Sequence, residues 1–241
     1  AIVTLCGGIH LAAQTVDGPQ LTLERVFSSN ELIPETFGPA RWLADGSSYT
    51  TVEPSSESAV GHDIVRYDAA TGSRQVLVSS ERLIPEGQTT ALGIDDYHWS
   101  PDGRFLLLFT NSQRVWRQNT RGDYWVIDRE TWAMHKLGGD ARPSTLMFAK
   151  FAPTGRRVAY VREHNLFVEA FPEGQVQQLT SDGSDTLING TFDWVYEEEL
   201  GLRDGYRWSP DGQFIAYWQL DSSEVRSFTL INNTDSLYPE L

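Results

Sequence analysis

Short runs of β-branched and aromatic residues recur along the chain, and each run follows a tight turn. Four such turns begin at residues 42, 99, 151 and 208, with the sequences WLADG, WSPDG, FAPTG and WSPDG. The runs that follow them read SYTTV, FLLLF, RVAYV and FIAYW. β-branched and aromatic residues favour strands, while Pro fixes φ in a turn and Gly accepts a positive φ. The pattern predicts a repeated β fold rather than a helical solenoid, which needs an apolar period of about 3.6 residues.

Each repeat has room for further strands beyond the first run. The pieces DIVRYD, YWVID and NLFVEAF have the same composition, and a second turn at residues 68–72 leads into RQVLV. One repeat therefore holds about four short strands, the size of a propeller blade. The predicted fold is all-β, a β-propeller of four-stranded antiparallel blades, and the chain carries part of a larger ring. A closed four-bladed ring is the alternative that the repeats leave open.

One segment interrupts this repeat of turns and strands, namely the sequence DWVYEEEL at residues 193–200. Asp193 suits a helix N-cap, and Glu and Leu favour helices, so we expect a short helix here. Successive helical positions differ by about 100°, yet flexible stems can bring the carboxylates of Glu198 and Glu199 to one point, with Glu197 farther round. A protonated amine fits two such carboxylates better than a metal, which wants more ligands. A solvated helix face is the other interpretation of the three glutamates.

The charge and composition exclude several classes of function. Among 241 residues, Lys and Arg number 19 and Asp and Glu 33, which gives a formal net charge of −14. This balance argues against nucleic-acid binding, which needs clustered basic residues. A single cysteine, Cys6, excludes a disulfide within the chain. Five histidines, at positions 10, 62, 98, 135 and 164, lack metal-ligand spacing, and there is no Gly-Lys phosphate loop, so we expect no metal and no cofactor.

The first residues differ in character from the rest of the chain. Residues 1–13 are apolar with small residues near their end, which is typical of the remnant of a secretory signal peptide. A short membrane anchor and an ordinary buried strand are the alternatives. We therefore expect a secreted or periplasmic protein, with residues 14–241 forming a partial N-terminal propeller. Asn189 and Asn232 each begin a glycosylation sequon.

The longer motifs resemble one known family. The sequences YHWSPDGRFLLLF, VWRQNTRGDYWVID, DWVYEEE and WSPDGQFIAYWQLDSSEV closely resemble the amino-terminal β-propeller of dipeptidyl peptidase IV, from about Glu31 to Leu241. The glutamate motif carries most of this resemblance, because Trp-Ser-Pro-Asp-Gly turns occur in many propellers. The resemblance implies an eight-bladed ring and an extracytoplasmic serine exopeptidase that releases N-terminal dipeptides with Pro or Ala in second place.

The resemblance also implies roles for individual residues. Glu198 and Glu199 would bind the α-ammonium of the substrate, and Arg117 would bind the carbonyl of its first peptide unit. The chain contains no Gly-x-Ser-x-Gly nucleophile motif, so we expect no catalytic residue within it. The triad would lie in a C-terminal α/β-hydrolase domain outside this chain. Expected partners are peptides with a free N-terminus, that hydrolase domain and a second copy in a homodimer. A non-catalytic peptide- or protein-binding propeller is the alternative function.

Overall fold

The computed structural model describes residues 20–34, 37–57 and 61–228. Contacts divide the chain into two units, Ala1–Thr36 and Phe37–Leu241. The described part of the first unit contains one short helix, α1 (Leu23–Phe27), whose N-cap side chain, Thr22, accepts a hydrogen bond from the Arg25 amide. Every described strand belongs to the second unit. The expected remnant at residues 1–13 lies outside the described residues.

The second unit begins with a regular four-stranded antiparallel sheet, which we call repeat 1. Its strands follow one another in space in the order of the sequence. A 3₁₀ turn, η1 (Ser80–Leu83), leads out of it. The strands of repeat 1 are β1 (Arg41–Trp42), β2 (Ser48–Pro54), β3 (His62–Asp68) and β4 (Arg74–Val78).

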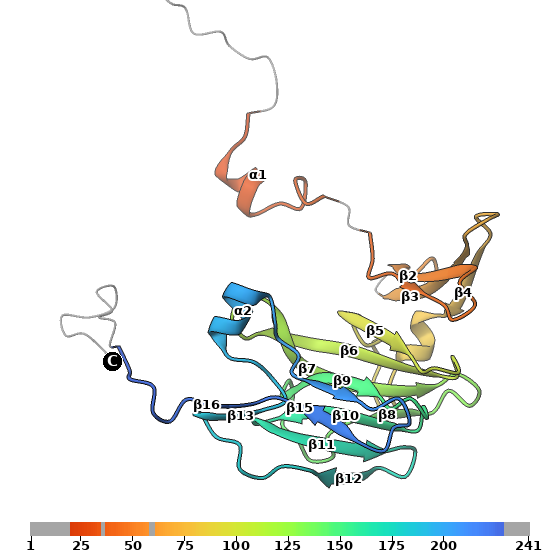
Figure 1. Cartoon of the computed structure of the whole chain (residues 1–241). Coiled ribbons are helices and arrows are strands. Elements are labelled where there is room, and N and C mark those ends of the chain that lie inside the picture. The colour runs from red at the N-terminus through yellow and green to blue at the C-terminus, as the bar shows by residue number, and fades with distance from the viewer. Residues whose placement is uncertain (1–19, 35–36, 58–60, 229–241) are drawn as a thin grey trace, which may run out of the picture. The chain divides into compact units, whose positions relative to one another are not determined.

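Repeats 2 and 3 have the same up-and-down order and are joined into one eight-stranded sheet. The join is a short pairing of β7 with β9, in which Arg121 lies opposite Met147. Figure 1 shows the two repeats side by side in green and teal. The strands of repeat 2 are β5 (Asp96–Trp99), β6 (Phe105–Arg114), β7 (Asn119–Asp128) and β8 (Met134–Lys136). Those of repeat 3 are β9 (Leu146–Phe151), β10 (Arg157–Arg162), β11 (Asn165–Ala170) and β12 (Gln175–Gln178).

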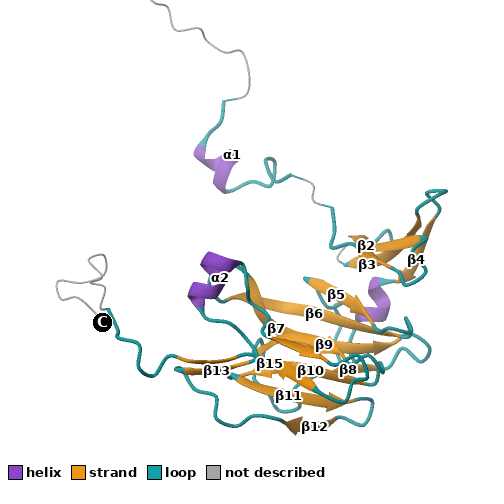
Figure 2. Ribbon diagram, in the orientation of Figure 1, coloured by secondary structure: helices purple, strands orange, loops and turns teal. Residues whose placement is uncertain are grey.

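Repeat 4 is formed by the last described elements and differs from the others. Its strands pair as β14 (Tyr206–Trp208) with β15 (Ile215–Tyr217), and β13 (Leu187–Asn189) with β16 (Gln219–Asp221). The helix α2 (Trp194–Leu200) lies between β13 and β14 in the chain. Strands dominate the described residues, as Figure 2 shows. The predicted all-β fold of four-stranded antiparallel repeats is confirmed, and so is the helix that carries the glutamates.

The repeated turns have the same internal hydrogen bonds. In the turn after β5, the Ser100 amide donates to the Phe105 carbonyl at 2.8 Å, and the Gly103 amide donates to the Ser100 carbonyl at 2.8 Å. Gly103 has φ +72, a conformation that favours glycine. The Ser100 hydroxyl donates to Asp102 at 2.6 Å. Ser209, Asp211, Gly212 and Phe214 repeat these bonds in the turn after β14, which explains why Ser, Asp and Gly recur in the sequence.

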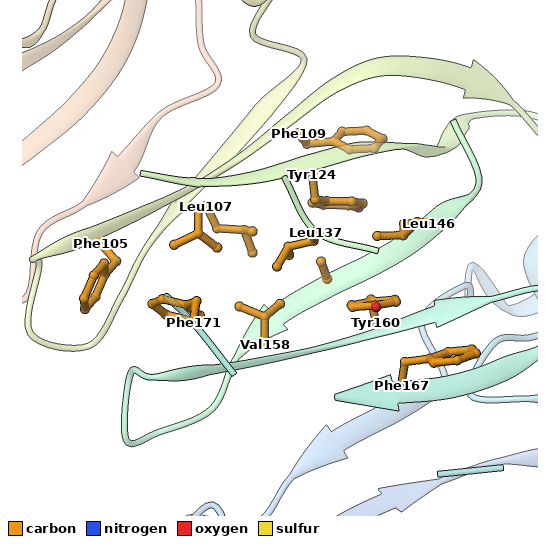
Figure 3. Close-up of a cluster of buried hydrophobic side chains, with 12 residues drawn as sticks. Phe105, Leu107, Phe109, Tyr124, Leu137, Leu146, Val158, Tyr160, Phe167 and Phe171 are labelled. Atoms are coloured by element: carbon orange, nitrogen blue, oxygen red, sulfur yellow. The ribbon is translucent and has the colours of Figure 1, made fainter. Parts of the chain in front are cut away.

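The hydrophobic core lies between successive repeats. Alternate side chains of β6 point to opposite faces, so Phe105 and Leu107 pack toward repeat 3, whereas Leu106 and Leu108 pack toward repeat 1. Figure 3 shows the cluster between repeats 2 and 3. Its aromatic rings contact one another across the boundary, with Phe105 and Phe171 edge-on at 4.9 Å between centroids. A third cluster lies between repeats 3 and 4. Stacked sheets buried on both faces are the packing expected of neighbouring propeller blades.

Repeats 1 and 2 also share a buried polar contact. The Thr50 hydroxyl on β2 accepts hydrogen bonds from the Tyr97 hydroxyl at 2.8 Å and from the Trp99 indole N–H at 3.0 Å. Thr50 is fully buried. Its neighbour Thr51 is also buried, but the Thr51 hydroxyl has no hydrogen-bond partner among the described residues.

This difference gives a matched test of the packing between repeats. Thr50→Val keeps the side-chain shape but leaves the Tyr97 and Trp99 donors without an acceptor, so we expect a loss of about 2 to 4 kcal/mol in the free energy of unfolding. Thr51→Val removes a hydroxyl that bonds to nothing described and is expected to be neutral or stabilising. Thermal unfolding of both variants of the whole protein measures the difference. Equal destabilisation by the two changes would contradict the contact.

Candidate functional site

A long hairpin carries Arg117 away from repeat 2. β6 and β7 are ten residues each, and their pairing shifts register between Thr110 and Arg114. Such bulges bend and twist a hairpin. At the tip, the Val115 amide donates to the Gln118 carbonyl at 3.1 Å, which presents Arg117 at the end of the turn. Glycine is required at position 122 of β7, because a Cβ there would lie 2.3 Å from the Phe109 ring on β6.

The helix α2 is short and is fixed at both ends by its caps. The Asp193 carboxylate accepts a hydrogen bond from the Tyr196 amide at 3.1 Å. Gly201 ends the helix in the left-handed region, with φ +66, and its amide donates to the Glu197 carbonyl. Phe192, just before the helix, stacks on Tyr196 with 5.1 Å between ring centroids. These contacts hold a seven-residue helix that would be marginal by itself.

The hairpin tip and the helix meet through one ion pair. Arg117 Nε donates to Glu198 Oε1 at 2.5 Å, and Arg117 Nη2 donates to Glu198 Oε2 at 2.9 Å. This is the two-pronged geometry in which a guanidinium binds a carboxylate most strongly. The Arg117 side chain is 68% exposed, whereas that of Glu198 is 16% exposed. The carboxylate is therefore the fixed partner, and the arginine reaches it from solvent.

Electrostatics at this pair favours the charged arginine. The hydrogen bonds to Glu198 and the charge of that residue raise the pKa of Arg117. Slight desolvation lowers the pKa of Arg117, whereas the charge of Glu197 raises it further. The guanidinium thus lies within the field of two of the three glutamates.

The other two glutamates differ sharply in environment. Glu199 is exposed, and its side chain makes no hydrogen bond or ion pair with any described residue. Glu197 is only 6% exposed. Its Oε1 is buried and has no hydrogen-bond partner among the described residues. The structure therefore brings Arg117 and Glu198 together and leaves Glu199 open to solvent beside them. Nothing in the pattern of the sequence signalled that Glu197 would be the buried one.

A cavity of about 610 Å³ is lined by residues that follow each partner of this ion pair in the chain. Gln118 and Asn119, which follow Arg117, line one part of it, and Arg203 and Asp204, which follow α2, line another. Aromatic side chains of repeats 2 and 3 form an apolar wall. Those aromatic residues are Trp99, Phe109, Tyr124, Phe148 and Phe151. The cavity can accept an apolar group next to the charged residues.

Lys150 on β9 is one of the basic groups of the cavity wall. Its ammonium forms an ion pair with Asp204 and donates to the Tyr206 carbonyl at 2.9 Å. Burial lowers the pKa of Lys150 to about 8, although the hydrogen bond and charge of Asp204 oppose the shift. Asp204 has a second basic partner, Arg207, at 2.9 Å. The ion pair between Lys150 and Asp204 joins repeats 3 and 4.

Two further expectations concern modification and metal binding. Asn189 is fully buried, and its side-chain amide donates to Asp182 at 2.9 Å, so this sequon is not accessible for glycosylation in the fold. Asn232 lies outside the described residues. Within the described ranges, no three His, Cys, Asp or Glu side chains are grouped to hold a metal ion. No helix among those residues is long and apolar enough to cross a bilayer.

The fold and the site together define a class of protein, namely a partial β-propeller with a glutamate-bearing helix inserted within its fourth repeat. The family model for the dipeptidyl peptidase IV N-terminal region matches residues 100–241. The crystal structure of Porphyromonas gingivalis dipeptidyl peptidase 4 superposes with a TM-score of 0.75 at 30% identity, covering 92% of this chain and 31% of that one. The chain belongs to the dipeptidyl peptidase IV family and corresponds to its N-terminal region.

Curated relatives agree with this assignment. Dipeptidyl aminopeptidase B of Saccharomyces cerevisiae is 33% identical over 180 residues, which are 73% of this chain and 21% of the yeast protein. Prolyl endopeptidase FAP of Mus musculus is 27% identical over 241 residues, which cover 99% of this chain and 30% of the mouse protein. The chain thus spans between a fifth and a third of the length of these relatives.

Lys150 predicts a rise in stability at alkaline pH. Its folded-state pKa of about 8 lies below the ordinary value of 10.5, so between these values the unfolded chain binds more protons and stability increases with pH. The Lys150 side chain is 28% exposed, and screening reduces the expected gain to roughly 1 kcal/mol by pH 9, below the range in which tyrosines of the unfolded chain ionise.

Denaturant unfolding from pH 7 to 9 checks this expectation. Lys150→Met should abolish the gain, because Asp204 keeps Arg207 as its partner. Lys136→Met, at the other lysine of the chain, serves as the control. A pH dependence that persists unchanged in Lys150→Met would rule out the assignment.

Proposed function

We propose that this chain is the substrate-recognition propeller of a serine exopeptidase, which in its complete form releases Xaa-Pro or Xaa-Ala dipeptides from a free N-terminus. The single observation that supports the proposal most directly is the paired Arg117 and Glu198, with Glu199 exposed on the next helical position. Family membership supports it as well, and so do relatives that bear the names dipeptidyl aminopeptidase and dipeptidyl peptidase 4.

The chemistry of an N-terminal ammonium suits this arrangement. An α-ammonium has three N–H donors and is mostly cationic near neutral pH. Glu198 and Glu199 would receive two of these donors, and Arg117 would donate to the carbonyl oxygen of the first peptide unit. Charge-assisted hydrogen bonds of this kind are the stronger ones in proteins. The clamp therefore selects a chain end over an internal peptide segment.

Fixing the chain end also fixes the cleavage point. If the ammonium is held at a constant distance from a nucleophile, the bond after the second residue is always the one presented for attack. The cleavage itself would require a Ser-His-Asp triad in an α/β-hydrolase domain, since this sequence has no nucleophile motif. The cavity lined by Gln118 and Asn119, which follow Arg117, would accept an apolar part of the bound peptide. Secretion or periplasmic location and homodimer formation belong to the same proposal.

Removing the two carboxylates tests the clamp. Glu198→Gln combined with Glu199→Gln in the full-length protein preserves side-chain size but removes both charges. We expect kcat/KM on an Ala-Pro leaving-group substrate to fall by at least about 100-fold, because two charge-assisted hydrogen bonds, each worth about 1.5 kcal/mol or more, are weakened together. Glu173→Gln, which removes an exposed charge in the β11–β12 turn, is the matched control. Unchanged kinetics in the double variant would refute the role of both residues.

A change in the α-amine of the substrate tests its contact with Glu198 and Glu199. Acetylation of the α-amine removes the positive charge and two N–H donors, so the full-length protein should no longer cleave an acetylated Ala-Pro substrate. Parallel assays of the free and acetylated substrates by product release make the measurement. Comparable rates on both would show that the enzyme does not measure from a free N-terminus.

A further inference from the structure

Glu197 is the acidic residue of α2 that the proposed clamp does not use. Its side chain is buried, and Oε1 receives no hydrogen bond from the described residues. Taking a carboxylate oxygen out of water without a donor is costly. A buried acceptor of this kind, next to a candidate binding site, is therefore expected to find a donor in some working state of the protein.

Glu197 directly precedes Glu198, the residue that Arg117 binds. The charge of Glu197 contributes to the raised pKa of Arg117, behind the larger effect of Glu198. Nε and Nη2 of Arg117 donate hydrogen bonds to the two oxygens of Glu198. Its remaining nitrogen, Nη1, makes no hydrogen bond to any residue that the structure describes. An unpaired donor therefore belongs to Arg117, and an unpaired buried acceptor belongs to the residue that directly precedes its partner Glu198.

Under the proposed function, Arg117 and the substrate ammonium compete for Glu198. Both Glu198 oxygens are occupied by Arg117 in this structure, yet the same carboxylate is to bind the substrate ammonium. Arg117 must in turn donate to a peptide carbonyl. Arg117 is 68% exposed, so water can solvate its charge when it loosens its hold on Glu198. A second carboxylate beside Glu198 would keep the released guanidinium at the helix, where it can donate to the peptide carbonyl.

We propose that Glu197 is a positioning residue, which becomes the counter-ion of Arg117 when a peptide ammonium binds to Glu198. Three carboxylates are then shared between two cations, with Glu197 serving the arginine, Glu198 shared and Glu199 serving the ammonium. This inference rests on the proposed function. It adds that the first residue of the glutamate triplet acts on substrate only through Arg117.

Glu197→Gln in the full-length protein tests the inference, with Glu173→Gln as the control for loss of a distant charge. We expect KM for an Ala-Pro leaving-group substrate to rise by about tenfold with kcat little changed, since the lost interaction positions the bound substrate. Glu197→Asp retains the charge and should recover part of this loss. The melting temperature should not fall, because the removed carboxylate oxygen has no described partner.

A double-mutant cycle separates action through Arg117 from independent action. In an Arg117→Ala background, Glu197→Gln should have no further effect on kcat/KM. An equal loss in both backgrounds, or a marked fall in melting temperature for Glu197→Gln, would overturn the inference. If Glu198→Gln with Glu199→Gln impairs the enzyme but Glu197→Gln does not, only this inference fails. If neither impairs it, the proposed clamp fails first.

Discussion

The fold depends on strands that are buried on both faces. β6 and β10 each lie in the middle of a repeat, and successive side chains pack against different neighbours. On β10, Val158 and Tyr160 join the cluster shared with repeat 2, while Ala159 and Val161 join the cluster shared with repeat 4. A one-residue slip of such a strand would exchange the two sets and spoil both interfaces at once. Two-sided burial therefore fixes the register within each repeat and the order of the repeats.

This stacking is what brings the candidate site together. Arg117 belongs to repeat 2 and Glu198 to the helix within repeat 4, so their positions are related through repeat 3. The pairing of β7 with β9 makes one connection. Tyr206 makes another, because its hydroxyl lies 2.5 and 2.7 Å from the carbonyl oxygens of Phe148 and Ala159. A contact between residues 81 positions apart is thus supported by packing on both sides of one intervening repeat.

The sequence predicts the regular parts of this structure better than the irregular ones. The Ser-Pro-Asp-Gly turns and the strands after them are local features, and they appear where the pattern places them. The Asp193 cap likewise marks the start of α2. The orientation of that helix is not a local property, because its apolar residues Trp194 and Val195 face solvent while Glu197 is buried. Hydrophobic patterning alone would turn the helix the other way.

The site shows the same division between local and long-range information. The glutamate triplet is visible in the sequence, but its spacing from Arg117 carries no sign that the two segments meet. Family resemblance pointed to Arg117, and the long β6–β7 hairpin with its register shifts explains how that arginine reaches the helix. The fourth repeat was expected to resemble the others. Its β14–β15 pair matches β5–β6 and β9–β10, but β13, before the helix, pairs with β16.

The Arg117–Glu198 pair also bears on selectivity under the proposed function. A simple amine that approached Glu198 would compete with Arg117 and offer the displaced guanidinium nothing in return. A peptide N-terminus brings an ammonium for the carboxylates together with a carbonyl oxygen that can accept from the arginine. Discrimination then comes from the cost of disturbing an existing ion pair, which only a ligand with both groups offsets. The exposed arginine on a hairpin tip is suited to move, whereas the largely buried carboxylate on a capped helix keeps its place.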